Sequence, residues 1–101
     1  MKLFKLLTVA TLFSTSSIYA ATMTFKAKNN LQWTEESAYF SSNKGVISIY
    51  TVNLSNKQLQ NLEIIKKGGC FTLTAKDHTF EKYEGTTSIM DFQRVKKVQC
   101  K

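Results

Sequence analysis

The chain has 101 residues, of which 43% are hydrophobic and 21% charged. Its 14 lysines and arginines outnumber its 7 aspartates and glutamates, so the formal net charge at neutral pH is +7. This length suits one small domain and excludes a second one. The positive charge favours anionic partners, although a surplus of lysine also serves solubility alone.

Residues 1–20 have the pattern of a secretory signal peptide. Lys2 and Lys5 precede a short apolar stretch, and small or polar residues follow as far as Ala20. The apolar stretch is shorter than the roughly 20 residues that span a bilayer, which disfavours a membrane anchor. We expect cleavage near Ala20, export to the periplasm or the medium, and a single domain over residues 21–101 with no transmembrane segment. Without the leader, 12 basic side chains face 7 acidic ones, a formal charge of +5.

Cys70 and Cys100 are the two cysteines of the chain. In an oxidising compartment such a pair is expected to form a disulfide, and only one connectivity exists. A small domain often needs a covalent bond of this kind, because its core is modest. The wide spacing disfavours redox catalysis, which more usually employs a C-x-x-C motif.

The first half of the exported chain has the alternation of β-strands. Met23, Phe25 and Ala27 alternate with polar residues, which is typical of a half-buried strand. Ser42 to Gly45 is a turn signal. The expected strands are residues 23–27, residues 31–33 with 38–41 as one interrupted strand or two short ones, and residues 46–52.

The pattern changes to that of a helix after residue 53. Ser55 and Gln58 form a capping-box signature, and Leu54 with Leu59 fits the accompanying hydrophobic staple. We expect about three helical turns, ending at Gly68 and Gly69. The apolar stripe of this helix consists of Leu59, Leu62 and Ile65.

Two further strands are predicted after the helix. They cover residues 70–75 and 88–99, separated by a polar connection at 76–78 and a turn at Glu84-Gly85. An irregularity is expected near Arg94, because the apolar alternation changes parity there. The cysteines lie symmetrically about Gly85, so an antiparallel hairpin would bring them together.

The element order strand, strand, strand, helix, strand, strand resembles an OB-fold. The resemblance implies a five-stranded antiparallel barrel with the helix between strands 3 and 4, and ligands over strands 2 and 3. One antiparallel sheet packed against a helix is the alternative. Phe25, Phe71 and Phe92 are expected in the core.

In size, leader, single disulfide and helix placement, the chain also looks similar to B subunits of AB-type bacterial toxins. The segments Gln32 to Thr34 and Ala38 to Ser41 resemble a sugar-contacting region seen in some of them. That resemblance implies a ring of subunits that binds host glycans. The chain departs from the pattern because too few strands separate these segments from the helix.

No enzyme constellation is recognised. His78 is the single histidine and lies beside Asp77, with no identifiable nucleophile or orienting partner. A disulfide would consume the soft metal ligands. We therefore expect no catalysis, no cofactor and no metal.

The candidate binding residues are aromatic side chains, most of them in predicted strands, and cations in or beside predicted loops. Rigid rings can stack on sugars or anchor a protein partner, and cations can orient an anionic ligand. The candidate residues are Trp33, Tyr39, Lys44, Tyr50, His78, Lys82, Tyr83 and Arg94.

These observations favour an exported, non-catalytic protein that binds a glycan or an anionic envelope polymer through a barrel face. The alternative is a protein-interaction module, such as an inhibitor of a secreted hydrolase or an assembly subunit. It predicts a continuous apolar patch or an exposed strand edge. An oligomer is compatible with both hypotheses. Export makes intracellular nucleic acid an unexpected partner.

Overall fold

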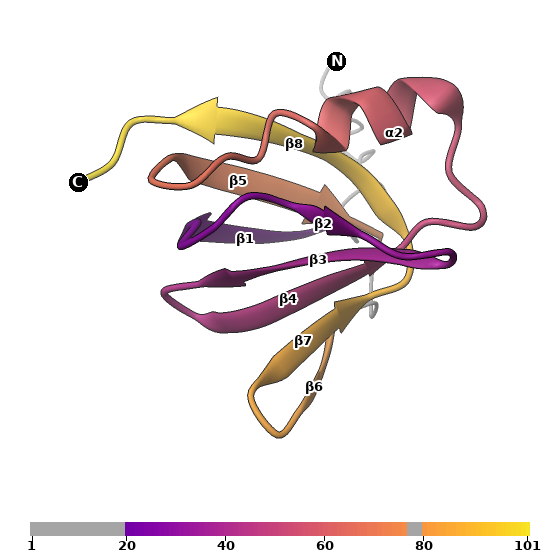
Figure 1. The fold of residues 1–101 in the computed structure, drawn as a ribbon, viewed down its shortest axis with the longest axis horizontal. Coiled ribbons are helices and arrows are strands. Elements are labelled where there is room, and N and C mark those ends of the chain that lie inside the picture. The colour runs from indigo at the N-terminus through magenta and orange to yellow at the C-terminus, as the bar shows by residue number, and fades with distance from the viewer. Residues whose placement is uncertain (1–19, 77–79) are drawn as a thin grey trace, which may run out of the picture.

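The computed structural model describes residues 20–76 and 80–101. Apart from Ala20, the predicted signal peptide lies outside these residues, as does His78. The described chain is mainly β-structure with one helix, as expected, and it is arranged in two sheets of three and five strands (Figure 1).

The smaller sheet has the antiparallel order β1-β5-β8. The prediction for residues 70–75 is confirmed in full, and the first strand begins two residues earlier than expected. Its strands are β1 (Ala21–Lys26), β5 (Cys70–Ala75) and β8 (Phe92–Val98).

The larger sheet has the order β2-β3-β4-β7-β6, in which β4 and β7 run parallel and the other neighbours are antiparallel. The expected five-stranded, wholly antiparallel barrel is therefore not what the two sheets display. The interrupted second strand is resolved as two short ones. The strands are β2 (Gln32–Trp33), β3 (Ser37–Ser42), β4 (Gly45–Tyr50), β6 (Phe80–Tyr83) and β7 (Thr86–Ile89).

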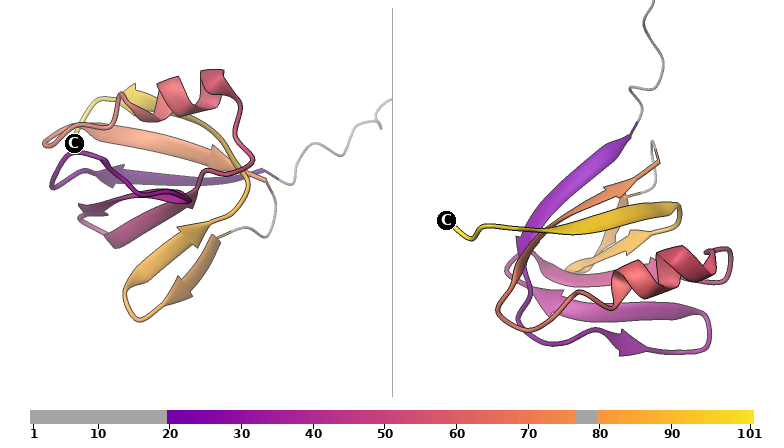
Figure 2. Two further views of the ribbon diagram at one scale, coloured as in Figure 1. Left: turned by 45° about the vertical axis from the view of Figure 1, so that its right-hand side comes forward. Right: turned by 90° about the horizontal axis from the view of Figure 1, so that it is seen from above.

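The predicted last strand, residues 88–99, is divided between the sheets. It breaks at Met90 and Asp91, where the chain leaves β7 in the larger sheet and enters β8 in the smaller one (Figure 2). The backbone N–H of Lys76 donates to the carbonyl of Asp91 at 3.0 Å and ties this bend to the end of β5. Strand β6 was not predicted, because its exposed sequence lacks the apolar alternation of a half-buried strand.

A second junction between the sheets lies at the end of β1. Ala27 forms an isolated antiparallel bridge with Ser42, and the N–H of Lys28 donates to the carbonyl of Ser41 at 2.8 Å. The Asn43 N–H donates to the Lys26 carbonyl, while its side-chain oxygen accepts from the Lys26 N–H. Both ends of the pair of sheets are therefore connected through the backbone.

The core lies between the sheets and the segment that follows β4. Phe25 contacts Phe40 and Phe71, with ring centroids 5.0 and 5.8 Å apart. Leu62 and Ile65 are fully buried against this cluster. The expected core positions Phe25, Phe71 and Phe92 are confirmed; these side chains are 2% exposed or less.

Helix α2 (Asn56–Leu62) begins at the predicted capping box, in which Ser55 and Gln58 exchange side-chain to backbone hydrogen bonds. It ends well before Gly68, so the prediction of three turns was wrong. After Leu62 the backbone continues in tighter turns, since the N–H groups of Ile64 and Ile65 donate to carbonyls three residues earlier. Further along, Gly68 donates to the carbonyl of Ala27, and the Gly69 carbonyl accepts from the Ala27 N–H. These bonds hold the glycines beside the β1 end and not in a helix.

Helix α2 lies along β8 and covers part of its edge (Figures 1 and 2). The Asn61 amide donates to the Val95 carbonyl at 2.9 Å and accepts from the Val95 N–H at 2.8 Å. Gln58 donates to the carbonyls of Phe92 and Gln93. Side chains of the helix thereby take the place of a neighbouring strand.

The Cys70–Cys100 disulfide is present, with Cα atoms 5.3 Å apart. Cys70 is paired with Val98 in the ladder, two residues before Cys100. A register shift between Thr74 and Ala75, opposite Gln93, confirms the irregularity expected near Arg94.

Candidate functional site

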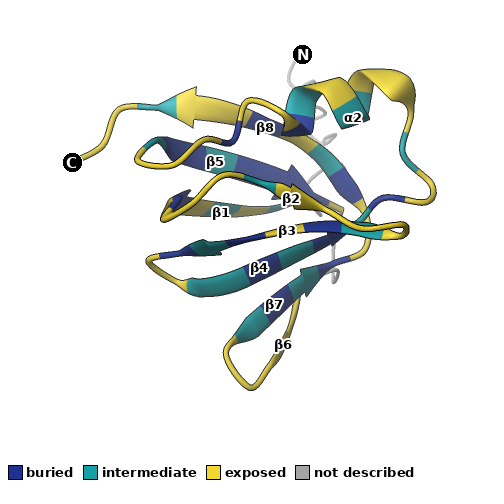
Figure 3. Ribbon diagram, in the orientation of Figure 1, coloured by how far each residue is buried: buried dark blue, intermediate teal, exposed yellow. Residues whose placement is uncertain are grey.

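The outer face of the larger sheet gathers aromatic and hydroxyl side chains. Buried and half-buried residues alternate along the second half of β4 (Figure 3). Ile47 and Ile49 are the buried ones and point into the core, so Ser48 and Tyr50 point outwards. Along β3, Phe40 is buried, whereas its neighbour Tyr39 is 42% exposed. Strict alternation along each strand therefore sets which side chains reach solvent.

The strand register aligns these outward side chains in rows. Directly paired residues lie on the same face of a sheet. One row crosses all five strands, and a second row crosses β3, β4, β7 and β6. The first row is Gln32, Tyr39, Ser48, Ser88 and Glu81, and the second is Ser41, Val46, Thr86 and Tyr83.

Three of the predicted site residues belong to this surface, which we call the tyrosine face: the outward side chains of β2, β3, β4, β7 and β6. Tyr39 is paired with Ser48, Tyr50 with Ser37, and Tyr83 with Thr86. Tyr83 is 76% exposed, and Tyr50 is half-buried. The face thus combines phenol rings with serine and threonine hydroxyls, which can donate and accept hydrogen bonds.

The turn between β3 and β4 fixes one end of this surface. The Ser42 hydroxyl donates to the Gly45 carbonyl at 2.8 Å and accepts from the Lys44 N–H at 3.0 Å. Gly45 has a φ of +99°, and a Cβ there would lie 2.5 Å from the Gly85 carbonyl oxygen. The predicted turn at 42–45 is confirmed, and it places Lys44 at the end of the sheet where β3 and β4 are connected.

Trp33 and Lys82 lie on the other side of the larger sheet. Trp33 is paired with Ala38, whose side chain is buried, so the indole faces away from Tyr39. It is 45% exposed and borders a cavity of about 180 Å³ together with residues that follow the helix, such as Glu63 and Lys66. Lys82 is paired with buried Thr87. Neither side chain contributes to the tyrosine face.

Arg94 lies in the smaller sheet, on β8, opposite Thr74. The predicted cations Lys82 and Arg94 therefore lie away from the tyrosine face, and Lys44 lies at the turn between β3 and β4. No placement is described for His78. The eight predicted residues therefore do not form one constellation.

Sequence reasoning missed the hydroxyl-bearing residues of the tyrosine face. Ser48 lies between Ile47 and Ile49, and Ser88 lies between Thr87 and Ile89. The alternation in the first of these segments could have identified Ser48 as outward, but it carries no chemical signature of a ligand site. Its cross-strand partners, Tyr39 and Ser88, are fixed only by the strand register.

Within residues 20–76 and 80–101, no group of three histidine, cysteine, aspartate or glutamate side chains is arranged to hold a metal ion. In the same part of the chain no helix is long and apolar enough to cross a membrane. No protein-family model, curated protein or solved structure matches this chain.

Proposed function

We propose that this chain is an exported, non-catalytic protein that binds a glycan on its tyrosine face. The observation that carries the proposal is the alignment of Tyr39, Tyr50 and Tyr83 with serine and threonine hydroxyls on one outward surface. Sugar rings present apolar faces that stack on aromatic rings and hydroxyl groups that exchange hydrogen bonds. Export rests on the leader-like pattern of residues 1–20.

We further propose that the architecture is a modified OB-like barrel. Strands β7 and β8 can be counted as one bent strand, and β2 and β6 as additions to the barrel. The order along the chain is then β1, β3, β4, α2, β5 and the bent strand. Pairing then runs from β1 through the Ala27–Ser42 bridge to β3, β4, the bent strand, β5 and back to β1. OB-folds bind ligands over strands 2 and 3, which correspond to β3 and β4. This correspondence supports the tyrosine face as the ligand site.

A glycan array tests the proposal directly. The full chain is expressed for export, purified oxidised, and applied beside Tyr39→Ala and Tyr50→Ala variants. We expect each variant to bind the selected glycan about five- to thirtyfold more weakly, since a hot-spot aromatic contributes roughly 1 to 2 kcal/mol. Ile64→Ala is the control, because Ile64 is 39% exposed and lies outside this face.

Two results would contradict the tyrosine face as the site. Absence of binding to every glycan is the first. The second is a loss of binding in Trp33→Ala with Tyr39→Ala unaffected, which would transfer the site to the opposite side of the sheet.

The second candidate function is a protein-interaction module, either a hydrolase inhibitor or a toxin-B-like assembly subunit. Strand β6 favours it, because β6 is an edge strand whose residues 81–83 are exposed. Free edges can pair with a strand of another chain. Light scattering during size-exclusion chromatography discriminates: a ring-sized oligomer with glycan binding favours the toxin-like form, and a monomer without glycan binding favours a protein target.

A further inference from the structure

The smaller sheet carries a positively charged outer face. Strands β1, β5 and β8 contain no aspartate or glutamate. Three cations are paired with alternate residues of β5: Lys26 with Cys70, Lys96 with Thr72, and Arg94 with Thr74. They therefore lie on one face of the sheet. The opposite face, which contacts the core, holds Phe25, Leu73 and Val95. This surface is separate from the tyrosine face and independent of the function proposed for it.

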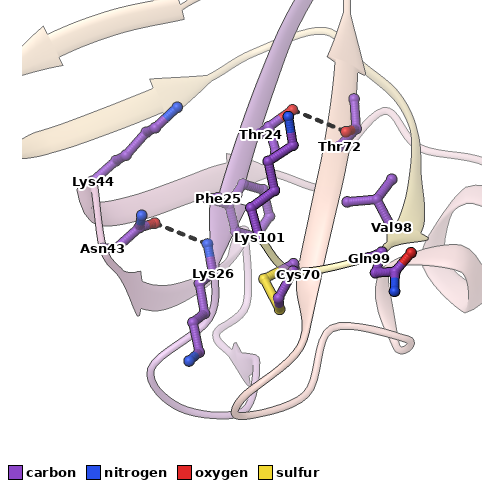
Figure 4. Close-up of a pocket in the computed structure, with 11 residues that line it drawn as sticks. Thr24, Phe25, Lys26, Asn43, Lys44, Cys70, Thr72, Val98, Gln99 and Lys101 are labelled. Carbon is purple, nitrogen blue, oxygen red and sulfur yellow. Dashed lines mark hydrogen bonds between the residues drawn. A yellow bond between two sulfur atoms is a disulfide. The ribbon is translucent and has the colours of Figure 1, made fainter.

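A cavity of about 590 Å³ lies at one end of this face. Figure 4 shows that its walls come from four segments: the end of β1, the turn after β3, the beginning of β5, and the end of β8 with the residues that follow it. Lys26, Lys44 and Lys101 line it, one each from β1, the turn after β3 and the chain after β8. Its volume is within the range of about 300 to 1,000 Å³ that small-molecule sites occupy.

The side chains that line the cavity include hydrogen-bond donors and no carboxylate. None of its 11 lining residues is an aspartate or glutamate. Across residues 20–76 and 80–101, no carboxylate forms an ion pair with Lys26, Lys44 or Lys101. Because no Asp or Glu side chain pairs with these three ammonium groups, an anionic group in the cavity would gain Coulomb attraction without displacing one.

Neutral donors accompany the lysines. The hydroxyls of Thr24 and Thr72 are 2.9 Å apart and bond to each other, which leaves one hydroxyl hydrogen for a ligand. The Asn43 oxygen accepts from the Lys26 N–H, so its amide nitrogen keeps its own two hydrogens. Ammonium, hydroxyl and amide donors together suit the oxygen atoms of a sulfate, phosphate or carboxylate.

The cations continue beyond the cavity along β8. Lys96 is opposite Thr72, and Arg94 lies two residues further along the strand, about 7 Å away. A linear polyanion can therefore meet a cation in the cavity and then two more along the sheet. Large exposed apolar side chains are absent from the described lining, which disfavours insertion into a lipid surface.

From this arrangement we propose that the cavity and the adjoining face of β5 and β8 bind an acidic polysaccharide. One anionic substituent occupies the cavity that Lys26, Lys44 and Lys101 line, and the following sugar units extend towards Lys96 and Arg94. The recognised feature is negative charge on a sugar chain, whereas the tyrosine face recognises the rings and hydroxyls.

Immobilised dextran sulfate and uncharged dextran provide the test, with binding measured by biolayer interferometry at 0.15 M salt. We expect the Lys26→Gln/Lys44→Gln variant of the full chain to bind dextran sulfate about tenfold more weakly than the unchanged protein. Lys57→Gln/Lys66→Gln loses the same charge, but neither residue lines the cavity, and it should remain within about twofold. Dextran should bind less than dextran sulfate.

Thr24→Glu is a second variant that keeps both lysines and places a carboxylate in the cavity. It should weaken dextran sulfate binding and leave the array-selected glycan unaffected, whereas Tyr39→Ala should do the reverse. Thermal melts verify that each variant is folded. Equal losses in the two double variants, or no binding to dextran sulfate, would overturn the proposal. Tighter capture by phosphatidylglycerol vesicles than by dextran sulfate would also overturn it, in favour of a lipid surface.

Discussion

At the scale of single residues, one step along a strand decides which surface a side chain serves. Trp33 and Tyr39 lie on neighbouring strands, yet Tyr39 is paired with Gln32 and Trp33 with Ala38. The two aromatics therefore face opposite sides of the same sheet. Aromatic content alone predicted both as binding residues, and only the register separates them.

Thr87 provides a residue-scale prediction. Its side chain is 1% exposed, and its hydroxyl has no hydrogen-bond partner among the described residues. A buried hydroxyl without a partner costs about 1 to 3 kcal/mol. Thr87→Val keeps the shape and removes this cost, so we expect the free energy of unfolding in urea to rise by about 1 kcal/mol.

The neighbouring Thr86→Val is the control for that measurement, because Thr86 points outwards and is only half-buried. It makes the same chemical change at a position where water can satisfy the hydroxyl. Its effect should stay within about 0.5 kcal/mol. A Thr87→Val variant that is less stable than the unchanged protein would mean that the hydroxyl has a partner.

At the scale of elements, local signals were sufficient where local chemistry determines the structure. The capping box of Ser55 and Gln58 and the strand of residues 70–75 could be predicted, because each depends on neighbours in sequence. The end of α2 could not be predicted, because the chain after it is positioned by backbone hydrogen bonds of Gly68 and Gly69 to Ala27, about 40 residues away.

The candidate site was predictable only in its residue types. The outward positions of Tyr39 and Tyr50 follow from the alternation of predicted strands, whereas Tyr83 lies on β6, which was not predicted. Their common face depends on the β3–β4, β4–β7 and β6–β7 registers. The parallel pairing of β4 with β7 joins segments about 40 residues apart. No local pattern specifies such a pairing. The pairing of β8 with β5 places Arg94 in the other sheet, away from the tyrosines with which it was grouped as a candidate.

Gly45 gives an element-scale prediction about this parallel pair. Gly45 and Gly68 both have positive φ, at +99° and +88°, but a Cβ on Gly45 would clash with the Gly85 carbonyl, while one on Gly68 meets open space. Gly68→Ala should cost roughly 1 to 2 kcal/mol for the left-handed backbone alone. Gly45→Ala should cost roughly 1 to 3 kcal/mol more, because β4 and β7 must move apart.

Urea unfolding followed by circular dichroism compares the two glycine variants. Since Gly68→Ala carries the same backbone strain, the difference between the variants isolates the contact of Gly45 with Gly85. Equal losses in stability would show that β4 and β7 do not approach each other as closely as the structure places them.

At the scale of the whole molecule, the two sheets present different chemistry to solvent. The larger sheet exposes tyrosines and hydroxyls, and the smaller one exposes Lys26, Arg94 and Lys96. The junctions at Ala27–Ser42 and at Asp91 hold these surfaces in a fixed relation. A single charged glycan chain long enough to pass Lys44 could use both surfaces, which would make its affinity depend on their separation.

The Cys70–Cys100 disulfide connects the beginning of β5 covalently to the chain after β8. Cys70 and Cys100 are 30 residues apart, and their bond encloses β5, β6, β7 and β8. In the chain-entropy treatment a loop of this length stabilises the fold by about 3 to 4 kcal/mol. Small domains have total stabilities near the lower end of about 5 to 15 kcal/mol, so most of the stability is at stake.

We therefore expect the Cys70→Ala/Cys100→Ala variant to unfold at a urea concentration about 2 to 4 M lower than the oxidised protein, since the slope for a small domain is about 1 to 1.5 kcal/mol per molar. Trp33 fluorescence reports the transition. Reductant should shift the unchanged protein to the same midpoint and leave the variant unaffected. A shift below about 0.5 M would mean that junction contacts such as Ala27–Ser42, rather than the covalent bond, hold the sheets together.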